Sequence, residues 1–526
     1  MNKKITILSL FICLSASLLW GQNNNIVILY DNDVHGAVEG YPAMASLRDS
    51  IRSITPYVSV VSMGDFLSGT SIGSASKGKF IVRLMNATGY DFVTLGNHEF
   101  DYGIPILNAS VKALNANVLC SNLATIADSS QCFPAYQIRN YGKTKIAFVG
   151  LSTPHTASTS TPQFFQDSIG HWLYTFFPNK IDSVLQHAVN AARRDGADYV
   201  VLLAHVGETN TPGLIAATSG IDVVLDGHSH SVIPHTILHN KEGREVLWTS
   251  TGTRFEYVGQ LTISPNGKMD SRLIPTQEIS ITAQDVADTL QTILQEYSSI
   301  GGREVGYSDI RLLRKSQDNE FVDSPMGNFF SDAYRMLTHA DIGIVNAGGM
   351  RKDIEKGIIH FDDLYSAAPF DNKVCVVEMD GQSLLDALEM SCRKGHTKGG
   401  GLLYVSGLHF DIDTTIASTV KVDANNIFLR VEGARRVCHV EVWDSESQTY
   451  QPLDPKRTYR VAGSDYVLLK NGDGVVFAHT KIVEDNICTY VQALERYLTE
   501  ILNNRISPIY EAPQGRIRAI GSTPQK

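Results

Sequence analysis

Beyond its N-terminus the sequence has no long apolar run, and its basic residues are not gathered into a stripe. No segment after residues 5–20 approaches the roughly 20 apolar residues of a membrane-spanning helix. The formal net charge is -10, and nucleic-acid binding depends on clusters of Lys and Arg. We therefore expect no nucleic-acid partner. A small anionic ligand stays compatible with this charge, since a few Arg side chains or metal ions can supply local positive charge.

Cysteine is scarce, with seven residues in 526, and no pair has the spacing of a structural zinc site. One of them, Cys13, lies in the N-terminal apolar run. The other six are Cys120, Cys132, Cys375, Cys392, Cys438 and Cys488. An even number permits disulfides in an exported protein, with Cys120 and Cys132 the nearest pair in sequence. Buried free thiols are an equally weighted alternative.

The N-terminus has the layout of a secretory signal peptide. Lys3 and Lys4 precede the apolar run of residues 5–20, and polar residues 22–25 follow it. We predict a signal peptide over residues 1–21, with cleavage after Ser17 or after Gly21. No small residue directly precedes Cys13, so a lipoprotein anchor is not expected. The mature protein is predicted to be periplasmic or extracellular, without an integral membrane segment.

Length and pattern predict two α/β domains joined by a helix. A chain of 526 residues exceeds one ordinary core, and 43% hydrophobic residues are typical of a globular protein. Before residue 280, apolar strands alternate with helical stretches such as 79–88 and 181–195. The predicted strands are 26–30, 57–63, 92–95, 145–150, 199–204, 222–225 and 245–249. The expected domains are 22–280 and 304–526, with a connector helix within 281–303.

Polar side chains with metal-binding chemistry follow five of these strands. They are Asp33, His35, Asp65, Asn97, His205, His228 and His230. Residues two apart point the same way in a strand, so the pairs at 33 and 35 and at 228 and 230 can each reach one ion. Carboxylate, amide and imidazole donors suit Zn, Mn, Fe or Co better than Ca. Seven donors exceed the need of one tetrahedral ion, so we expect two divalent ions (Zn, Mn, Mg or Co) roughly 3.5–4 Å apart, bridged by Asp65.

Such a pair of ions can activate water for attack on phosphorus, while the leaving oxygen still needs a proton. His98 is next to Asn97 but is not needed as a ligand, so it can donate that proton or a charged hydrogen bond. Asp101 can fix the tautomer of His98 and raise its basicity. Glu99 is expected to support the site without being catalytic.

These residues resemble the calcineurin-like metallophosphoesterase signature and, more narrowly, the 5′-nucleotidase family. The strings that carry the resemblance are Asp33-Val34-His35-Gly36, Gly64-Asp65, Gly96-Asn97-His98-Glu99-Phe100-Asp101, Leu203-Ala204-His205 and Gly227-His228-Ser229-His230. The resemblance implies one metal held by Asp33, His35, Asp65 and His230, and another by Asp65, Asn97, His205 and His228. It also implies that His98 and Asp101 form the catalytic dyad. Family members differ at the position of His230, where Gln or Asn also occurs.

The second half resembles the C-terminal substrate-binding domain of that family. Residues 346–351 (Asn-Ala-Gly-Gly-Met-Arg), 369–372 (Pro-Phe-Asp-Asn) and 471–474 (Asn-Gly-Asp-Gly) carry this resemblance. Arg351 can hold a substrate phosphate through its planar fork, with Asn372 as a second contact and Asp473 accepting from sugar hydroxyls. The family commonly stacks the base between two aromatic rings, but Leu402 and Val467 stand at the aligned positions. Tyr404 or Tyr466 can substitute for them. The run Gly399–Gly401 is expected to be a flexible turn and not a phosphate loop.

Two classes of function remain open. The first is an exported hydrolase, expected to be a 5′-nucleotidase acting on a small nucleotide, with UDP-sugar hydrolase and 2′,3′-cyclic-nucleotide phosphodiesterase as alternatives that share the metal chemistry. The resemblance implies domains that rotate, with residues 282–298 as the hinge element. The second class is a non-catalytic nucleotide-binding protein, against which the intact Asp65, Asn97, His98 and Asp101 argue. The accepted base or sugar, the native metal and the oligomeric state stay open.

Overall fold

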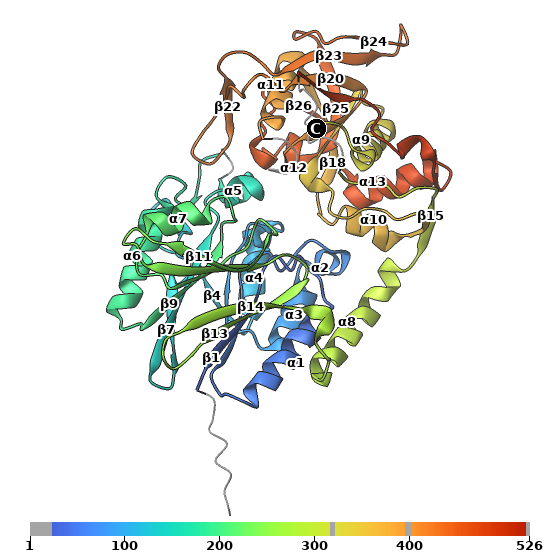
Figure 1. The fold of residues 1–526 in the computed structure, drawn as a ribbon. Helices are drawn as coiled ribbons and strands as arrows, with labels where there is room; N and C mark the ends of the chain where they lie inside the picture. Colours follow the sequence, from blue (N-terminus) through green and yellow to red (C-terminus); the bar gives the residue numbers. More distant parts are fainter. Residues whose placement is uncertain (1–23, 168, 316–320, 395–400, 522–526) are drawn as a thin grey trace, which may run out of the picture.

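The computed structural model describes residues 24–167, 169–315, 321–394 and 401–521. They form two α/β units, one above the other in Figure 1, joined by helix α8 (Gln284–Gly301). The predicted signal peptide, Cys13, and Gly399 and Gly400 of the predicted glycine turn lie outside the described residues. No helix within the described ranges combines the length and the apolar character of a membrane span.

The first unit contains two six-stranded sheets. One has the order β14-β13-β1-β2-β3-β4, and the other has the order β11-β12-β10-β9-β7-β6. The strands of the first sheet are β1 (Ile26–Asp31), β2 (Val58–Ser62), β3 (Phe92–Thr94), β4 (Asn117–Leu119), β13 (Tyr257–Ile263) and β14 (Met269–Pro275). Those of the second are β6 (Tyr136–Tyr141), β7 (Thr144–Ser152), β9 (Tyr199–His205), β10 (Val223–Leu225), β11 (Val232–His239) and β12 (Glu245–Thr251).

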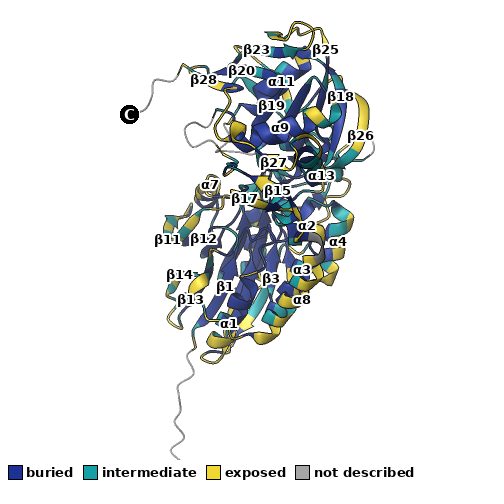
Figure 2. Cartoon of the chain, turned by 90° about the vertical axis from the view of Figure 1, so that its right-hand side faces the viewer, coloured by how far each residue is buried: buried dark blue, intermediate teal, exposed yellow. Residues whose placement is uncertain are grey.

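The two sheets face each other and are covered by helices on their outer faces, which gives four layers. Their inner faces form one apolar core, in which the rings of Phe92 and Phe148 stack with centroids 4.5 Å apart. Helices α1 (Tyr41–Arg52), α3 (Lys79–Thr88) and α8 cover the first sheet, and α6 (Ile181–Arg194) covers the second. Figure 2 shows central strands such as β1 and β3 mostly buried, whereas the outer helix faces and parts of the edge strands β11 and β14 are exposed. Shorter helices are α2 (Ser71–Ala75), α4 (Ile104–Ala113), α5 (Thr156–Thr159) and α7 (Thr211–Ala217).

The strands that precede the predicted site residues run parallel within each sheet. In the first sheet β1, β2, β3 and β4 are successive parallel neighbours, and in the second β7, β9, β10 and β12 are. Parallel strands place their C-terminal ends at one edge of a sheet, which is where sites of open α/β sheets are found. The residues that directly follow these strands therefore lie together at the C-terminal edge of each sheet.

The second unit is built on the five-stranded sheet β19-β16-β25-β18-β26. Its strands are β16 (Ile342–Asn346), β18 (Lys373–Asp380), β19 (Leu403–Ser406), β25 (Thr458–Ser464) and β26 (Lys481–Thr489). The helices around it are α9 (Pro325–Thr338), α10 (Phe361–Ala367), α11 (Gly381–Ser391), α12 (Asp465–Leu468) and α13 (Tyr490–Arg496). A four-stranded sheet combines β20 (Leu408–Asp413), β23 (Val437–Asp444), β24 (Thr449–Pro452) and β28 (Ile517–Ile520).

Smaller pairings complete this unit. A three-stranded sheet joins β15 (Glu304–Ser308), β17 (Gly357–His360) and β27 (Arg505–Ile506), and β21 (Val420–Val422) pairs with β22 (Phe428–Val431) as a hairpin. In the first unit, β5 (Ala124–Thr125) pairs with β8 (Tyr174–Thr175). In Figure 1 the hairpin of β21 and β22 extends toward α5 of the first unit.

The predicted strands and helices are present, with ends that differ by at most three residues. The predicted connector is α8, and it packs on α1 and α3 through Val286, Leu290 and Ile293. All six described cysteines are free thiols. Cys120 is buried while Cys132 is exposed, so the disulfide weighed for this pair is not formed.

Candidate metal centre between the two units

The seven predicted metal donors come together at the strand edge that faces the second unit. Asp33 and His35 follow β1, Asp65 follows β2, and Asn97 follows β3. His205 ends β9, and His228 and His230 follow β10. Two groups of donor atoms each lie within 4.8 Å of one another, the first from Asp33, His35 and His230 and the second from Asp65, His205 and His228.

Asp65 lies between the two groups. Its Oδ2 is 3.1 Å from His205 Nε2 and 3.8 Å from His35 Nε2. In the other group, Asp33 Oδ1 lies 3.4 Å from His230 Nε2. One carboxylate thus reaches imidazoles of both groups, which is the position that a bridging ligand needs. His98 forms a further group of this kind with His35 and Asp65.

Several of these donor atoms are buried without a hydrogen bond of good geometry, although some lie close to one another. They include Asp33 Oδ1, Asn97 Oδ1 and His205 Nε2. Buried polar atoms are nearly always paired, so unpaired ones on converging side chains require an explanation such as an ion. The Nδ1 of His205 lies 2.7 Å from the carbonyl oxygen of Met63 and donates to it. That contact leaves the Nε2 lone pair directed into the site, as in many metal-bound histidines. The residues present therefore fit a bound cation.

Charge within the cluster also favours cations. Burial acts to raise the pKa of the Asp65 carboxyl, but the neighbouring His205 and His98 hold it well below its usual range. Burial acts to lower the pKa of His205, yet Asp65 and Asp33 raise it to about 10. Burial and the adjacent His205 lower the pKa of His228 to about 4. The buried carboxylates thus draw positive charge to the site.

The backbone at these residues is held in an uncommon conformation. Asp33, His35, Asp65, His228 and His230 all have φ between 48° and 79°. This left-handed region is unfavourable for residues with a Cβ atom, and residues held there cluster at functional sites. Adjacent glycines make room for the donors. A Cβ atom on Gly96 would lie 2.2 Å from Asp65 Oδ1, and one on Gly227 would lie 2.9 Å from Asp33 Oδ2.

Glu99 anchors the loops that carry Asp65 and Asn97. Its Oε1 accepts from the backbone N–H groups of Phe66 and Leu67, and its Oε2 accepts from those of Asp65 and Gly96, at 2.7–3.2 Å. The side chain is buried and does not line the cavity between the units. These contacts agree with the predicted supporting role.

His98 and Asp101 are paired beside the donors. His98 Nδ1 lies 2.9 Å from Asp101 Oδ2 and 3.1 Å from Oδ1, and Ser68 Oγ donates to Oδ2 at 2.5 Å. Burial acts to lower the pKa of His98, but the Asp101 and Asp65 carboxylates raise it above its ordinary value. Both side chains line the cavity. The pair can therefore hold a proton at a histidine that faces the metal donors.

The second unit closes over the donors. Arg351 Nη2 lies 3.4 Å from His35 Nε2, and the Phe370 ring stacks on His98 with centroids 5.8 Å apart. The guanidinium of Arg351 also lies 5.7 Å from the Phe370 ring centroid. A cavity of about 1060 Å³ lies between the units, and Asn372 and Asp473 line it as well. Asp473 Oδ2 accepts from Asn346 Nδ2 at 2.8 Å.

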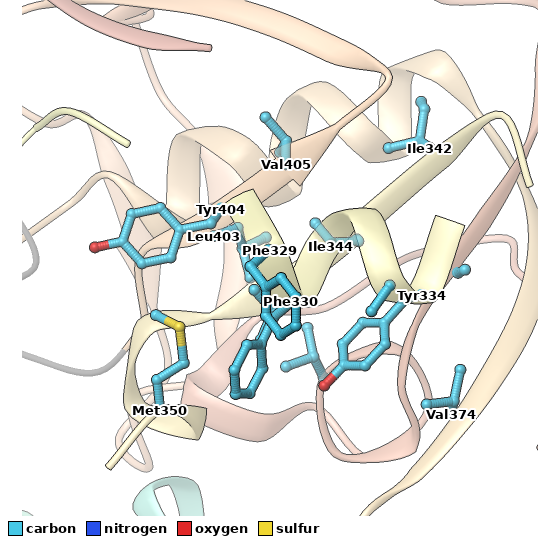
Figure 3. Packing of buried hydrophobic residues seen from close by; sticks show 14 of the residues in the cluster. Phe329, Phe330, Tyr334, Ile342, Ile344, Met350, Val374, Leu403, Tyr404 and Val405 are labelled. Carbon is cyan, nitrogen blue, oxygen red and sulfur yellow. The ribbon is translucent and has the colours of Figure 1, made fainter. Parts of the chain in front are cut away.

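The two tyrosines considered for base recognition, Tyr466 and Tyr404, lie in different surroundings. Tyr466 lines the cavity, and its hydroxyl accepts from the backbone N–H of Asp473 at 3.1 Å. Tyr404 does not line the cavity, so of the two tyrosines offered as alternatives for a clamp ring only Tyr466 is placed to contact a ligand there. It is buried beside Leu403 and Val405 in the core of the second unit (Figure 3), where its ring packs against Gly327 of α9. Leu402 and Val467 are also buried core residues.

Sequence reasoning missed several residues that shape the site. Asn32 donates to Asp33 Oδ2 at 2.8 Å and to the carbonyl oxygen of Gly252 at 2.7 Å, which positions the carboxylate. Asn97 Nδ2 points to the carbonyl oxygen of Thr159 at 3.4 Å. Phe370 was part of a quoted motif but was assigned no role. Asn32 directly precedes a candidate ligand, whereas no sequence signal marks Thr159.

Comparison with known proteins agrees with this architecture. The family model of the calcineurin-like phosphoesterases matches residues 26–232, and that of the 5′-nucleotidase C-terminal domain matches residues 304–481. The chain is 25% identical over 521 residues to the snake venom 5′-nucleotidase of Gloydius brevicauda, with 89% of this chain and 84% of that protein covered. It is 24% identical over 565 residues to the 5′-nucleotidase of Bos taurus, with 95% and 92% covered.

A third relative is longer than this chain. The trifunctional nucleotide phosphoesterase protein YfkN of Bacillus subtilis is 24% identical over 94% of this chain, which spans 35% of that protein. Among solved structures, the fold resembles that of a 5′-nucleotidase precursor from Thermus thermophilus, with a TM-score of 0.80, 23% identity and coverage of 95% of this chain and 100% of that one. The chain therefore belongs to the 5′-nucleotidase family, with a calcineurin-like phosphoesterase domain followed by a 5′-nucleotidase C-terminal domain, and is a metal-dependent phosphoester hydrolase.

Proposed function

We propose that the protein is an exported 5′-nucleotidase that converts a nucleoside 5′-monophosphate to nucleoside and phosphate. The observation that carries the proposal is the cavity between the units, where the donor cluster, the His98–Asp101 pair and Arg351 face one space. The names of the similar proteins from Gloydius brevicauda and Bos taurus support a nucleotide as substrate. Export rests on the predicted signal peptide.

We assign two divalent ions to the donors. Asp33, His35, Asp65 and His230 would hold one, and Asp65, Asn97, His205 and His228 would hold the other. Bound there, the ions would lower the pKa of a water molecule and neutralise charge on the phosphoryl oxygens. The unpaired Asp33 Oδ1, Asn97 Oδ1 and His205 Nε2 support this assignment. The identity of the metal is tested by the experiments below.

The remaining roles belong to the side chains that surround the phosphoryl group. Arg351 is partly buried, lines the cavity and can bind non-bridging oxygens through its planar fork. His98 Nε2 can donate a proton to the leaving ribose oxygen, because Asp101 holds Nδ1 and so keeps the ring in one orientation. Phe370 covers His98 and limits the access of bulk water. Asn372 and Asp473 line the cavity where the sugar would lie.

Phosphate release by the purified mature chain tests the proposal. With Mn²⁺ or Zn²⁺ present, we would compare AMP, UMP, UDP-glucose, 2′,3′-cyclic AMP and bis-p-nitrophenyl phosphate, adding a separate nucleotidase where the product keeps its phosphate. Turnover of AMP or UMP well above that of the diesters is the expected result. Turnover of only the diesters would overturn the nucleotidase assignment. Binding of metals and nucleotide without turnover would favour a nucleotide-binding protein.

A further inference from the structure

A cluster of basic side chains lines the cavity away from the metal donors. It consists of His155, Arg393 and Lys394, and we call it the distal cationic cluster. His155 comes from the first unit, where it is the N-cap residue of α5. Arg393 and Lys394 come from the second unit, directly after α11. The cluster therefore exists only when both units face the same cavity.

Helix α5 separates His155, the first-unit member of this cluster, from the metal donors. The carbonyl oxygen of Thr159, at the end of α5, is the atom that Asn97 Nδ2 approaches at 3.4 Å. His155 lies one helical turn earlier, which is roughly 6 Å along the helix axis. Burial and the charges of Lys394 and Arg393 lower the pKa of His155, and Asp423 opposes this shift. None of the three cluster residues is a predicted metal donor. The cluster is therefore a second charged region of the cavity, separate from the metal donors.

Within the described part of the chain, no carboxylate forms an ion pair with Arg393 or Lys394. The pKa of Arg393 is lowered by burial alone, and that of Lys394 by burial and by Arg393. Arg393 Nη2 donates to the amide oxygen of Asn426 at 2.9 Å, which is a neutral partner. Asp423, the acid that acts on His155, accepts through Oδ1 from the backbone N–H groups of Asn425 and Ile427. That carboxylate is already used by the hairpin turn.

Two of the acidic groups elsewhere on the cavity wall, Asp371 and Asp473, have partners of their own. Asp371 pairs with Lys373 at 2.7 Å and with Lys77 at 3.6 Å. Asp473 accepts from Asn346 at 2.8 Å. The C-terminal end of α11 attracts cations and accounts for part of the preference for Arg393 and Lys394 there. The end of α11 does not account for His155, which belongs to the first unit and lines the same cavity.

We infer that the preferred substrate carries a second anionic group at the end remote from the phosphate that reacts. The inference deepens the proposed function, on which it rests. The metal centre and Arg351 would hold the reacting phosphate, while the distal cationic cluster would bind a carboxylate or a second phosphate. Charge-assisted hydrogen bonds are about twice as strong as neutral ones and are directional, so this contact would select among nucleotides.

The dimensions and the lining of the cavity agree with an extended substrate. Its volume of about 1060 Å³ is slightly above the roughly 300–1,000 Å³ typical of ligand pockets. Leu402 and Val467 are buried in the core, so neither can stack on a base, and of the tyrosines considered only Tyr466 lines the cavity. In this inference, the distal cationic cluster recognises the nucleotide through its charge, in place of a pair of aromatic rings that would stack on the base.

Three matched nucleotides test the inference. AMP has a neutral far edge, N6-succinyl-AMP adds two carboxylates at N6, and N6-(2-phosphonooxyethyl)-AMP adds a phosphate there. We would measure kcat/KM for release of the 5′-phosphate with the metal-loaded full-length mature chain, identifying the dephosphorylated product by mass spectrometry. One or both doubly anionic substrates should exceed AMP by roughly 10–100-fold, the range expected for a hydrogen bond to a charged group. The two arms distinguish a carboxylate from a phosphate.

Variants connect the preference to the cluster. Arg393→Gln, Lys394→Gln and His155→Gln should each lower the ratio of kcat/KM between the favoured substrate and AMP, most strongly for Arg393→Gln. Arg430→Gln is the matched control, because Arg430 lies in the nearby hairpin, pairs with Glu432 and does not line the cavity. Lys394 is the most exposed of the three cluster residues, so its variant keeps the test available if the Arg393 variant folds poorly.

Two results would overturn the inference. One is equal kcat/KM for AMP and both doubly anionic nucleotides. The other is a preference that all three cluster variants retain. Absence of hydrolysis with every nucleotide, AMP included, would instead refute the proposed function on which the inference rests.

Discussion

The Nδ1 atom of His98 lies 2.9 Å from Oδ2 of Asp101, and the same carboxylate oxygen accepts from Ser68. The pair is partly buried beside the metal donors, and the Phe370 ring of the second unit stacks on His98. Asp101 thus orients an imidazole whose other nitrogen is available to the cavity. This relationship places a proton donor where the leaving oxygen of a phosphoester would lie.

Replacing His98 with Ala should leave both metals bound and reduce turnover by roughly 10²–10⁴-fold, the usual contribution of a general acid. Metal content and kcat for AMP are the measurements. His187→Ala, on the exposed face of α6, is the control. Unchanged turnover in the His98 variant would refute the role.

Glu99→Gln should destabilise the first unit. Each oxygen of Glu99 accepts from two backbone N–H groups, and a Gln amide would turn an NH₂ group toward two of these donors. Leaving buried donors unpaired costs about 1–3 kcal/mol. Thermal unfolding should show the loss, together with weaker metal binding because the Asp65 loop is anchored there. Glu278→Gln, at an exposed position, should have neither effect.

A buried ion pair links the C-terminal segment to α9. Arg516 Nη1 and Nη2 each lie 2.8 Å from an oxygen of Asp332, which also accepts from Ser406 and Tyr510. Asp332→Asn removes the charge that Arg516 needs, and breaking a buried pair costs about 3–5 kcal/mol. Urea unfolding at pH 7 measures this loss. Asp270→Asn, with a largely exposed side chain, should change stability far less.

The same pair predicts a pH dependence of stability. Burial acts to raise the pKa of Asp332, but the hydrogen bonds from Arg516 hold it below the ordinary value. Because the folded pKa lies below the unfolded one, the stabilisation is complete above the unfolded pKa of about 3.9 and is lost as the pH falls through the folded pKa. Wild type should therefore lose more stability than Asp332→Asn between pH 5 and pH 2. Parallel curves for the two proteins would contradict this account.

Asp362 joins the two units and the helix between them. Its Oδ1 accepts from Ser71 of the first unit and, at 2.7 Å, from the Tyr297 hydroxyl of α8. Asp362→Ala should weaken this junction and increase the mean separation of the units, measured as the radius of gyration in solution scattering. Asp362→Asn keeps an acceptor oxygen and should restore most of the wild-type value. An unchanged radius in the Ala variant would show that other contacts suffice.

The sequence predicts much of the first unit because its strands are short runs of Val, Ile and Leu with polar donors just beyond their ends. Parallel pairing then brings Asp33, Asp65 and Asn97 to one edge, as the pattern indicates. The left-handed conformation of Asp33, His35 and Asp65 could not be read in this way, since no glycine marks those positions.

The second unit was harder to predict. Strand β19 is buried on both faces, so its pattern cannot distinguish a tyrosine in the core from one in a cavity, and Tyr404 was misjudged for that reason. The distal cationic cluster depends on how the units meet, which brings His155 beside Arg393 and Lys394 although they are far apart in sequence. No local sequence pattern predicts how the two units contact each other.

The most direct test of the metal-dependent nucleotidase account combines metal content with AMP turnover in wild type and in Asp65→Asn, the variant at the proposed bridge. We expect two divalent ions per wild-type chain, phosphate release that a chelator abolishes and added Mn²⁺ or Zn²⁺ restores, and the loss of at least one ion and of most turnover in the variant. Two ions and full turnover in Asp65→Asn would contradict the account, as would a wild-type chain that holds two ions and releases no phosphate from AMP.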